Sequence, residues 1–217
     1  MRRPALLTIA ALCFALVAAT PAAGHNGGAN PPQSHAYGAS LLTWQKRWMA
    51  WAFGSGTNPL LNEVCGEQVG MVFFLTAAEE PGTEVDCRIP PGTPLLATPG
   101  GCIIWPFPEE TPEEMLEERD ACLEELSEPS ATLDGRSLGD LDHLLRRTGL
   151  YTIALEPGNF IQEVEPENEA VSGDHTLVTS GGWFLRIPPL PPGHHVLVLS
   201  DQTEGGLLDI TFHLTVR

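Results

Sequence analysis

The sequence predicts a mainly β protein, an antiparallel β-sandwich with two packed α-helices. The C-terminal half contains six short segments of strand length separated by turn residues. The last of them alternates apolar and polar side chains, as a strand with one solvated face does. Few other segments show helical periodicity, and this combination is typical of a sandwich. The six predicted strands are residues 151–155, 159–163, 175–179, 183–187, 195–199 and 207–216.

Residues 41–52 are predicted to form the helix around which the core is organised. Trp44, Trp48 and Trp51 are four and three residues apart, so their indole rings share one helix face, with Gln45, Lys46 and Arg47 on the other side. Each indole can bury about 150–250 Å². The apolar run 69–75 has the length of a buried strand, and we expect it to cover this helix face.

A second helix is predicted to begin after Thr111. Thr111 and Glu114 have the spacing of a capping box, and Pro112 suits the first helical position. Cys122 falls on the apolar face, whereas the acidic residues between 109 and 128 line the outside. That segment lacks the Asp-rich loop of a calcium site, so its charges indicate a solvated surface. Shorter elements are expected at 84–89 and 93–97, as strands, and at 140–147, as helical turns.

The N-terminal region has the order of a secretory signal peptide. Two arginines precede an apolar run and then small residues, and cleavage could follow Ala19, Ala22 or Gly24. With the last of these, residues 1–24 are the signal and 25–40, rich in Gly, Asn and Pro, form a flexible leader. Residues 41–217 are then expected to form a single disulfide-linked domain. The apolar run is too short for a membrane span, so the mature protein is expected to be soluble and secreted or periplasmic.

The chain is acidic, with a formal charge of −17. Without Arg2 and Arg3 it carries nine basic and 28 acidic residues, a charge of −19. Such a surface repels phosphate backbones and anionic lipids, which argues against nucleic acid and membranes as partners. The remaining partner classes are an extracytoplasmic protein or a small-molecule ligand.

Four cysteines follow the signal segment, and an even number in an oxidising compartment predicts two disulfides. Three connectivities are possible. We favour Cys65 with Cys87 and Cys102 with Cys122, because each pair then encloses one compact unit and the bridges do not cross. The close spacing of a zinc site is absent, and no cofactor is expected.

The segment Gly135-Arg136-Ser137-Leu138-Gly139 matches the G-x-S-x-G pattern of serine hydrolases. An acid and a base would complete a triad with Ser137. The candidates are Asp174, Asp140 or Asp142 for the acid and His195, His175, His194 or His213 for the base. The preceding segment 131–134 is short and polar for the central parallel strand of such an enzyme, and the chain lacks strand–helix alternation. A surface turn is the competing interpretation of the motif.

Cleavage after Gly24 would leave His25 as the N-terminal residue, whose amine and imidazole can together bind copper beside a second histidine. Candidates for that second ligand are His35, His175 and His195. This arrangement resembles that of secreted copper monooxygenases and copper carriers built on β-sandwiches. The glycine-rich segment after His25 lacks the rigidity that would aim the ligands.

Several short motifs occur in an order that resembles a family of secreted bacterial proteins, described only as hypothetical or signal-peptide proteins. The likeness spans most of the chain from Trp44 to Val216, and residues 93–98 depart from that family's bulky apolar strand. It implies a location and a fold, and no activity. The motifs are Trp44-x3-Trp48-x2-Trp51, Asn58-Pro59-Leu60, Cys65-Gly66-Glu67-Gln68, Cys87-x-Ile89-Pro90-x-Gly92, Leu133-Asp134-Gly135, Pro191-Pro192-Gly193-x-His195 and Asp209-Ile210-Thr211-Phe212.

These observations favour a secreted, non-catalytic binding or structural module. A serine hydrolase using Ser137 and a copper-binding protein using His25 are the alternatives. Loops carry binding sites in sandwiches, and we expect a ligand groove near residues 188–195 and 54–59.

Overall fold

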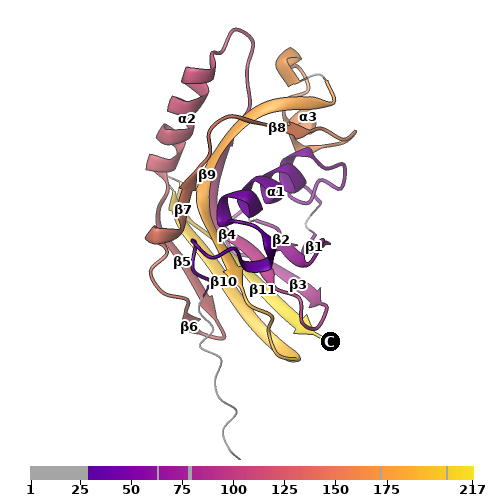
Figure 1. Ribbon diagram of the computed structural model, residues 1–217, viewed down its shortest axis with the longest axis vertical. Coiled ribbons are helices and arrows are strands. Elements are labelled where there is room, and N and C mark those ends of the chain that lie inside the picture. Colours follow the sequence, from indigo (N-terminus) through magenta and orange to yellow (C-terminus); the bar gives the residue numbers. More distant parts are fainter. Residues whose placement is uncertain (1–28, 63, 78–79, 172, 204) are drawn as a thin grey trace, which may run out of the picture.

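The computed structural model describes residues 29–62, 64–77, 80–171, 173–203 and 205–217. The chain is mainly β, with two sheets packed on one another and helices around them (Figure 1). One sheet has the strand order β1-β2-β4-β9-β7, with β8 also paired to β9, and the other has the order β3-β11-β10-β5-β6. We refer to them as sheet A and sheet B.

The strands of sheet A are β1 (Gly66–Val69), β2 (Val72–Leu75), β4 (Leu95–Ile104), β7 (Leu145–Arg147), β8 (Tyr151–Ala154) and β9 (His175–Ile187). Those of sheet B are β3 (Thr83–Ile89), β5 (Ser127–Leu133), β6 (Arg136–Ser137), β10 (Gly193–Thr203) and β11 (Gly206–Val216). The α-helices are α1 (Leu41–Gly54), α2 (Pro112–Glu125) and α3 (Phe160–Val164). Single 3₁₀ turns occur at η1 (Ala36–Gly38), η2 (Asp142–Leu144) and η3 (Glu169–Val171).

Most strand pairs are antiparallel, as predicted, but β2 with β4 and β3 with β11 are parallel. Both sheets are therefore mixed. Residues 159–163 were predicted as a strand, yet α3 forms there, because the Asn159 side chain accepts a hydrogen bond from the Gln162 N–H and caps the helix. The strands predicted at 175–179 and 183–187 are one strand, β9, that continues through Gly181 and Gly182.

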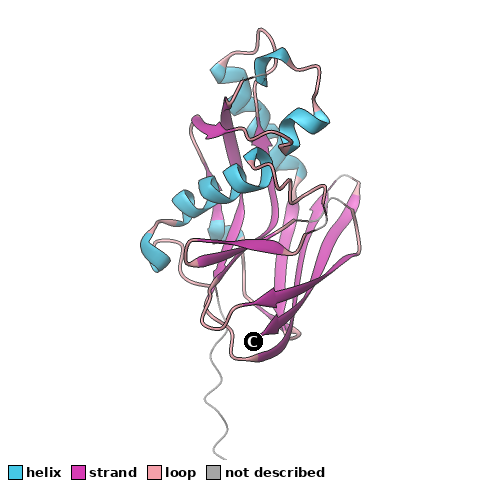
Figure 2. Cartoon of the chain, turned by 90° about the vertical axis from the view of Figure 1, so that its right-hand side faces the viewer, coloured by secondary structure: helices cyan, strands magenta, loops and turns pink. Residues whose placement is uncertain are grey.

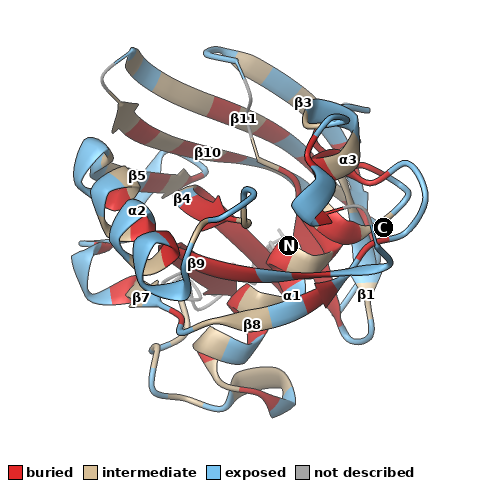
Figure 3. Cartoon of the chain, turned by 90° about the horizontal axis from the view of Figure 1, so that it is seen from above, coloured by how far each residue is buried: buried red, intermediate tan, exposed pale blue. Residues whose placement is uncertain are grey.

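Helix α1 packs on the face of sheet A that points away from sheet B. The Trp44, Trp48 and Trp51 indoles are all buried, and Trp48 meets Phe184 of β9 edge-on, with the ring centroids 5.6 Å apart. Gln45, placed on the polar side by its spacing, is also buried, and its amide donates to Ser180 Oγ. Figure 2 shows α1 crossing the strands, and Figure 3 shows the buried residues of α1, β4 and β9 lying together.

The opposite face of sheet A is shared by sheet B and α2. Thr111 and Glu114 form the predicted capping box at the start of α2. The disulfide Cys102–Cys122 joins β4 to α2, and Cys65–Cys87 joins the chain entering β1 of sheet A to β3 of sheet B. The pairing is the one that the cysteine spacing favoured. One bridge thus connects the two sheets and the other fixes α2 on sheet A.

Residues 29–40, part of the predicted leader, lie against sheet A. The buried Arg186 guanidinium of β9 donates hydrogen bonds to the carbonyls of Pro31, Ser34 and Ala39, and the Asn30 N–H donates to the Arg186 carbonyl. We therefore count these residues with the folded domain. The predicted signal peptide, 1–24, lies outside the described residues. None of the helices in the described ranges has the length and apolar character that crossing a bilayer requires.

We predict that replacing Cys102 and Cys122 together by alanine lowers the free energy of unfolding by about 3 kcal/mol. The bridge closes a loop of 20 residues, and losing it raises the entropy of the unfolded chain. Urea unfolding followed by tryptophan fluorescence measures the change. An unchanged free energy of unfolding in the double variant would contradict the prediction.

Candidate functional site

The strongest candidate site lies where strand β4 continues past the end of its neighbour β2 in sheet A. Strand β2 pairs with β4 only at Phe73–Leu95 and Phe74–Leu96, so β4 continues beyond the end of β2. Its pairing with β9 also shifts between Ala97 and Gly100. Facing it in sheet B, the pairing of β10 with β5 shifts between Ser200 and Gln202. Two irregular strands therefore meet at one place, and bulges of this kind often adjoin functional sites.

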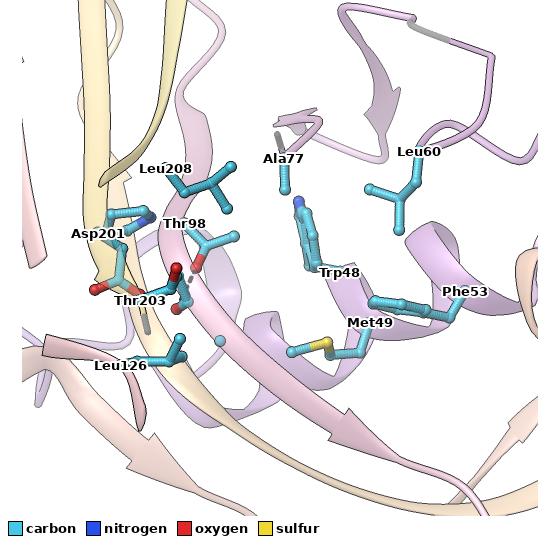
Figure 4. Close-up of a pocket in the computed structure, with 13 residues that line it drawn as sticks. Trp48, Met49, Phe53, Leu60, Ala77, Thr98, Leu126, Asp201, Thr203 and Leu208 are labelled. Carbon is cyan, nitrogen blue, oxygen red and sulfur yellow. Dashed lines mark hydrogen bonds between the residues drawn. The ribbon is translucent and has the colours of Figure 1, made fainter. Parts of the chain in front are cut away.

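A pocket of about 120 Å³ occupies this place. Figure 4 shows its two sides, with Asp201, Thr203, Leu126 and Leu208 across from Trp48, Met49 and Phe53 of α1. The wall is mainly apolar. We call it the Asp201 pocket, and it is lined by Trp48, Met49, Phe53, Leu60, Ala77, Thr98, Pro99, Gly100, Gly101, Leu126, Asp201, Thr203 and Leu208.

Asp201 is the one titratable residue among the described residues that line the pocket. Its residue exposure is 1%, and among the described residues neither carboxylate oxygen has a hydrogen-bond partner. Burial raises the pKa of the Asp201 carboxyl to about 6, although the nearby backbone N–H groups of Gln202 and Ser127 lower it in part. A buried charge without a partner is costly, so this side chain opposes folding at neutral pH.

Gly100 makes room for this carboxylate. A Cβ atom at position 100 would lie 2.1 Å from Asp201 Oδ2 and 2.8 Å from Asp201 Cγ, so any larger residue would displace the side chain. The absence of a side chain on β4 is thus what lets Asp201 of β10 lie directly over the β4 backbone.

The other polar side chains of the pocket have already used their hydrogens. Thr98 Oγ1 donates to the Gly100 carbonyl at 2.9 Å, and Thr203 Oγ1 donates to the Gly206 carbonyl at 2.9 Å. Trp48 Nε1 donates to the Leu75 carbonyl at 2.7 Å. The side-chain atoms that are left to meet a ligand are therefore oxygen acceptors, namely the two threonine hydroxyls and the Asp201 carboxylate.

A second hollow of about 230 Å³ adjoins the Asp201 pocket and shares Leu60 and Ala77 with it. Leu61, Glu80 and Val85 also line this outer hollow, and Leu61 is exposed. The pair of hollows lies beside Leu60, close to the predicted range 54–59. Neither predicted range, 54–59 nor 188–195, contributes a residue to either hollow.

Ser137 lies in a β-hairpin rather than in a nucleophile elbow. Asp134 and Gly135, with φ of 52° and 73°, form the two-residue turn between β5 and β6, and Leu133 pairs with Arg136 on either side of it. Ser137 is exposed, and its Oγ accepts a hydrogen bond from the Gly139 N–H. The G-x-S-x-G match here coincides with a surface turn.

The predicted acid and base have other partners. His195 Nδ1 lies 2.8 Å from Asp134 Oδ2, and His195 Nε2 lies 3.0 Å from the Pro191 carbonyl. Burial of the ring disfavours its charge, but these two acceptors outweigh that effect and raise the His195 pKa. Asp174 contacts its neighbour His175, at 2.9 Å, near the surface. The described residues therefore do not bring Ser137, Asp174 and His195 together.

The copper hypothesis rests on His25, which lies outside the described residues. Of its candidate co-ligands, His35 is exposed, while His175 and His195 pair with Asp174 and Asp134. No group of three or more metal-binding side chains occurs within the part of the chain that the structure describes.

Sequence reasoning missed Asp201, although a signal was present. Leu197, Leu199 and Asp201 follow one another at every second position, and all three are buried on the same face of β10. The predicted strand ends at residue 199, whereas β10 continues to Thr203. Extending the alternation by one step would have placed a carboxylate in the core.

Comparison of the sequence with family models and with curated proteins finds no match. The resemblance to secreted bacterial proteins therefore stays a prediction.

We predict that Asp201→Asn stabilises the protein at pH 7.5. A pKa raised from 3.8 to about 6 means that the folded state gains stability from the bound proton below about pH 4 and loses it as the pH rises through 6. At about 1.4 kcal/mol per pKa unit, the charge costs about 2–3 kcal/mol above pH 6. The gain in free energy of unfolding of the variant over the parent protein should therefore be larger at pH 7.5 than at pH 4 by that amount.

Urea unfolding at the two pH values measures this difference. Asp86→Asn, which removes an exposed carboxylate from β3, is the control for the change in net charge. A stability difference between Asp201→Asn and the parent that is the same at both pH values would contradict the burial argument.

Proposed function

We propose that the chain is a non-catalytic binding protein that acts outside the cytoplasm and holds a small ligand in the Asp201 pocket. The observation that carries the proposal is the pocket itself, with apolar walls around one buried carboxylate whose oxygens have no hydrogen-bond partner in the described part of the chain. Ligand sites commonly combine an apolar lining with a few polar groups of fixed position.

The size of the pocket limits the ligand. A cavity of about 150 Å³ accommodates benzene, so about 120 Å³ suits a molecule of roughly five or six non-hydrogen atoms. This is smaller than the space that drug-sized ligands occupy. A compact molecule with an apolar body and one polar group fits the lining best.

Two disulfides and the predicted signal segment support a location in an oxidising compartment. The strong negative charge of the chain disfavours nucleic acid and anionic lipid as partners. Since the triad candidates have other partners, binding explains the described residues better than hydrolysis does.

We predict that cyclopentanol, a neutral probe of six non-hydrogen atoms, binds the pocket with a Kd of about 1 mM. This requires about 0.7 kcal/mol per non-hydrogen atom, within the range that small ligands reach. Trp48 lines the pocket, so binding should change the tryptophan fluorescence and the ligand NMR linewidths, and it should raise Tm.

Two variants locate the binding. Leu208→Phe adds volume to the pocket wall and should abolish the response, whereas Leu177→Phe enlarges an exposed side chain of β9 and should leave it intact. A parent protein that shows no response, or an equal response in Leu208→Phe, would refute the proposed site.

A further inference from the structure

The free polar atoms of the Asp201 pocket share one chemical character. Trp48, Thr98 and Thr203 each donate their hydrogen to a backbone carbonyl, that of Leu75, Gly100 and Gly206 respectively. The Asp201 carboxylate supplies two more oxygens without a partner among the described residues. A ligand group that bonds to all of these side chains must therefore donate several hydrogen bonds, because the side chains have no hydrogen left to donate to it.

We propose that the ligand is a small organic ammonium ion, a compact amine whose charged group binds Asp201 and whose apolar body lies against Trp48 and Phe53. This proposal deepens the proposed function and rests on it. A primary ammonium group has three N–H donors and one positive charge, and so matches the carboxylate and the threonine hydroxyls around it.

The apolar wall selects an organic cation over a metal ion. Calcium takes six to eight oxygen ligands and magnesium six, while the side chains of the pocket offer the carboxylate and two hydroxyls. The remaining lining residues are carbon-rich, and they include the aromatic rings of Trp48 and Phe53, which offer an apolar surface to the body of the ligand. An alkyl or cycloalkyl amine contacts both parts of the pocket, with its ammonium group at the carboxylate and hydroxyls and its hydrocarbon body at the carbon-rich lining.

The charge of the protein favours the same class of ligand. The chain has a formal charge of −17, and Glu80 lines the outer hollow that adjoins the pocket through Leu60 and Ala77. An acidic surface raises the local concentration of cations and lowers that of anions. A carboxylate ligand of equal size would be repelled by this negative surface and then by the Asp201 charge.

Binding of an ammonium ion should depend on the ionisation of Asp201. Because burial raises its pKa to about 6, the free protein holds the charged carboxylate at pH 7.5 and the neutral acid at pH 5. An alkylamine stays protonated across this range, as lysine does. No other titratable group among the described residues lines the pocket, so the loss of affinity at low pH reports on Asp201 itself.

The test compares two probes of nearly equal shape, cyclopentylamine and cyclopentanol, by NMR titration and calorimetry on the full chain. In the parent protein at pH 7.5 the amine should bind about 10- to 100-fold more tightly than the alcohol, which is the usual gain from hydrogen bonds to a charged partner. Between pH 7.5 and 5 the amine should lose about tenfold in affinity and the alcohol should not change.

Asp201→Asn is the decisive variant, and it is expected to be at least as stable as the parent at pH 7.5, so a loss of binding would not reflect unfolding. It should bind the two probes with similar affinity and show no pH dependence. Asp86→Asn removes one exposed carboxylate and should keep the preference for the amine. Calcium chloride and cyclopentanecarboxylate, titrated alone, should not bind the pocket.

The outcomes separate this inference from the proposed function. If the alcohol binds as tightly as the amine, or if Asp201→Asn keeps the preference, the ammonium proposal is wrong while the binding site stands. Calcium or the carboxylate binding in place of the amine would also overturn it. If neither the amine nor the alcohol binds the parent protein, both proposals fail.

Discussion

The packing of Trp48 determines both the core and the pocket. Its indole meets Phe184 of β9, and its N–H donates to the carbonyl of Leu75, the last residue of β2. This contact fixes α1 at the point where β2 ends and β4 continues without it. The indole therefore forms part of the buried core and one wall of the Asp201 pocket. A change that moved α1 would alter both.

Glycines on the paired strands β4 and β9 set the shape of the opposite wall. A Cβ at Gly101 would lie 2.8 Å from the Gly181 carbonyl oxygen, and a Cβ at Gly182 would lie 2.8 Å from the Gly100 carbonyl oxygen. Side chains at these positions would force the two strands apart. The close approach lets β9 continue as one strand, and the bare backbone at Gly100 receives Asp201 from the other sheet.

Local signals predicted the parts of the fold that depend on neighbouring residues. The spacing of Trp44, Trp48 and Trp51 and the capping box of Thr111 and Glu114 each lie within a few residues. The parallel pairing of β2 with β4 could not be predicted in this way, because it depends on which distant strands become neighbours. Similarly, α3 forms where an apolar segment could be either strand or helix, and the Asn159 cap decides.

The pocket was harder to predict than the fold because it depends on two bulges in different sheets. The alternation along β10 contains Asp201, but only the structure shows that Gly100 faces it and that the threonine hydrogens are used elsewhere. Residue type alone pointed instead to Ser137 and His195, whose contacts are those of a hairpin turn and a surface ion pair.

The contrast with the other buried charges supports a functional role for Asp201. The described residues include three charged side chains that are buried, Arg119, Arg186 and Asp201. The Arg186 guanidinium donates to three backbone carbonyls and to a serine hydroxyl, so that only its Nε has no partner among the residues described. Arg119 bonds to Asp120 and to the Thr148 carbonyl. Both arginines thus connect segments of the fold.

Asp201 has no ion-pair partner within the described residues, and although the nearby backbone N–H groups of Gln202 and Ser127 lower its pKa in part, burial dominates and its charge opposes folding at neutral pH. An asparagine would fill nearly the same space without that cost. A carboxylate in this position stabilises the protein only when something positive shares the pocket, because the attraction between opposite charges is strong where water is excluded. Among the described residues no such positive partner faces Asp201, and under the proposed function the ligand would take that place and stabilise the fold by removing the penalty of the bare charge.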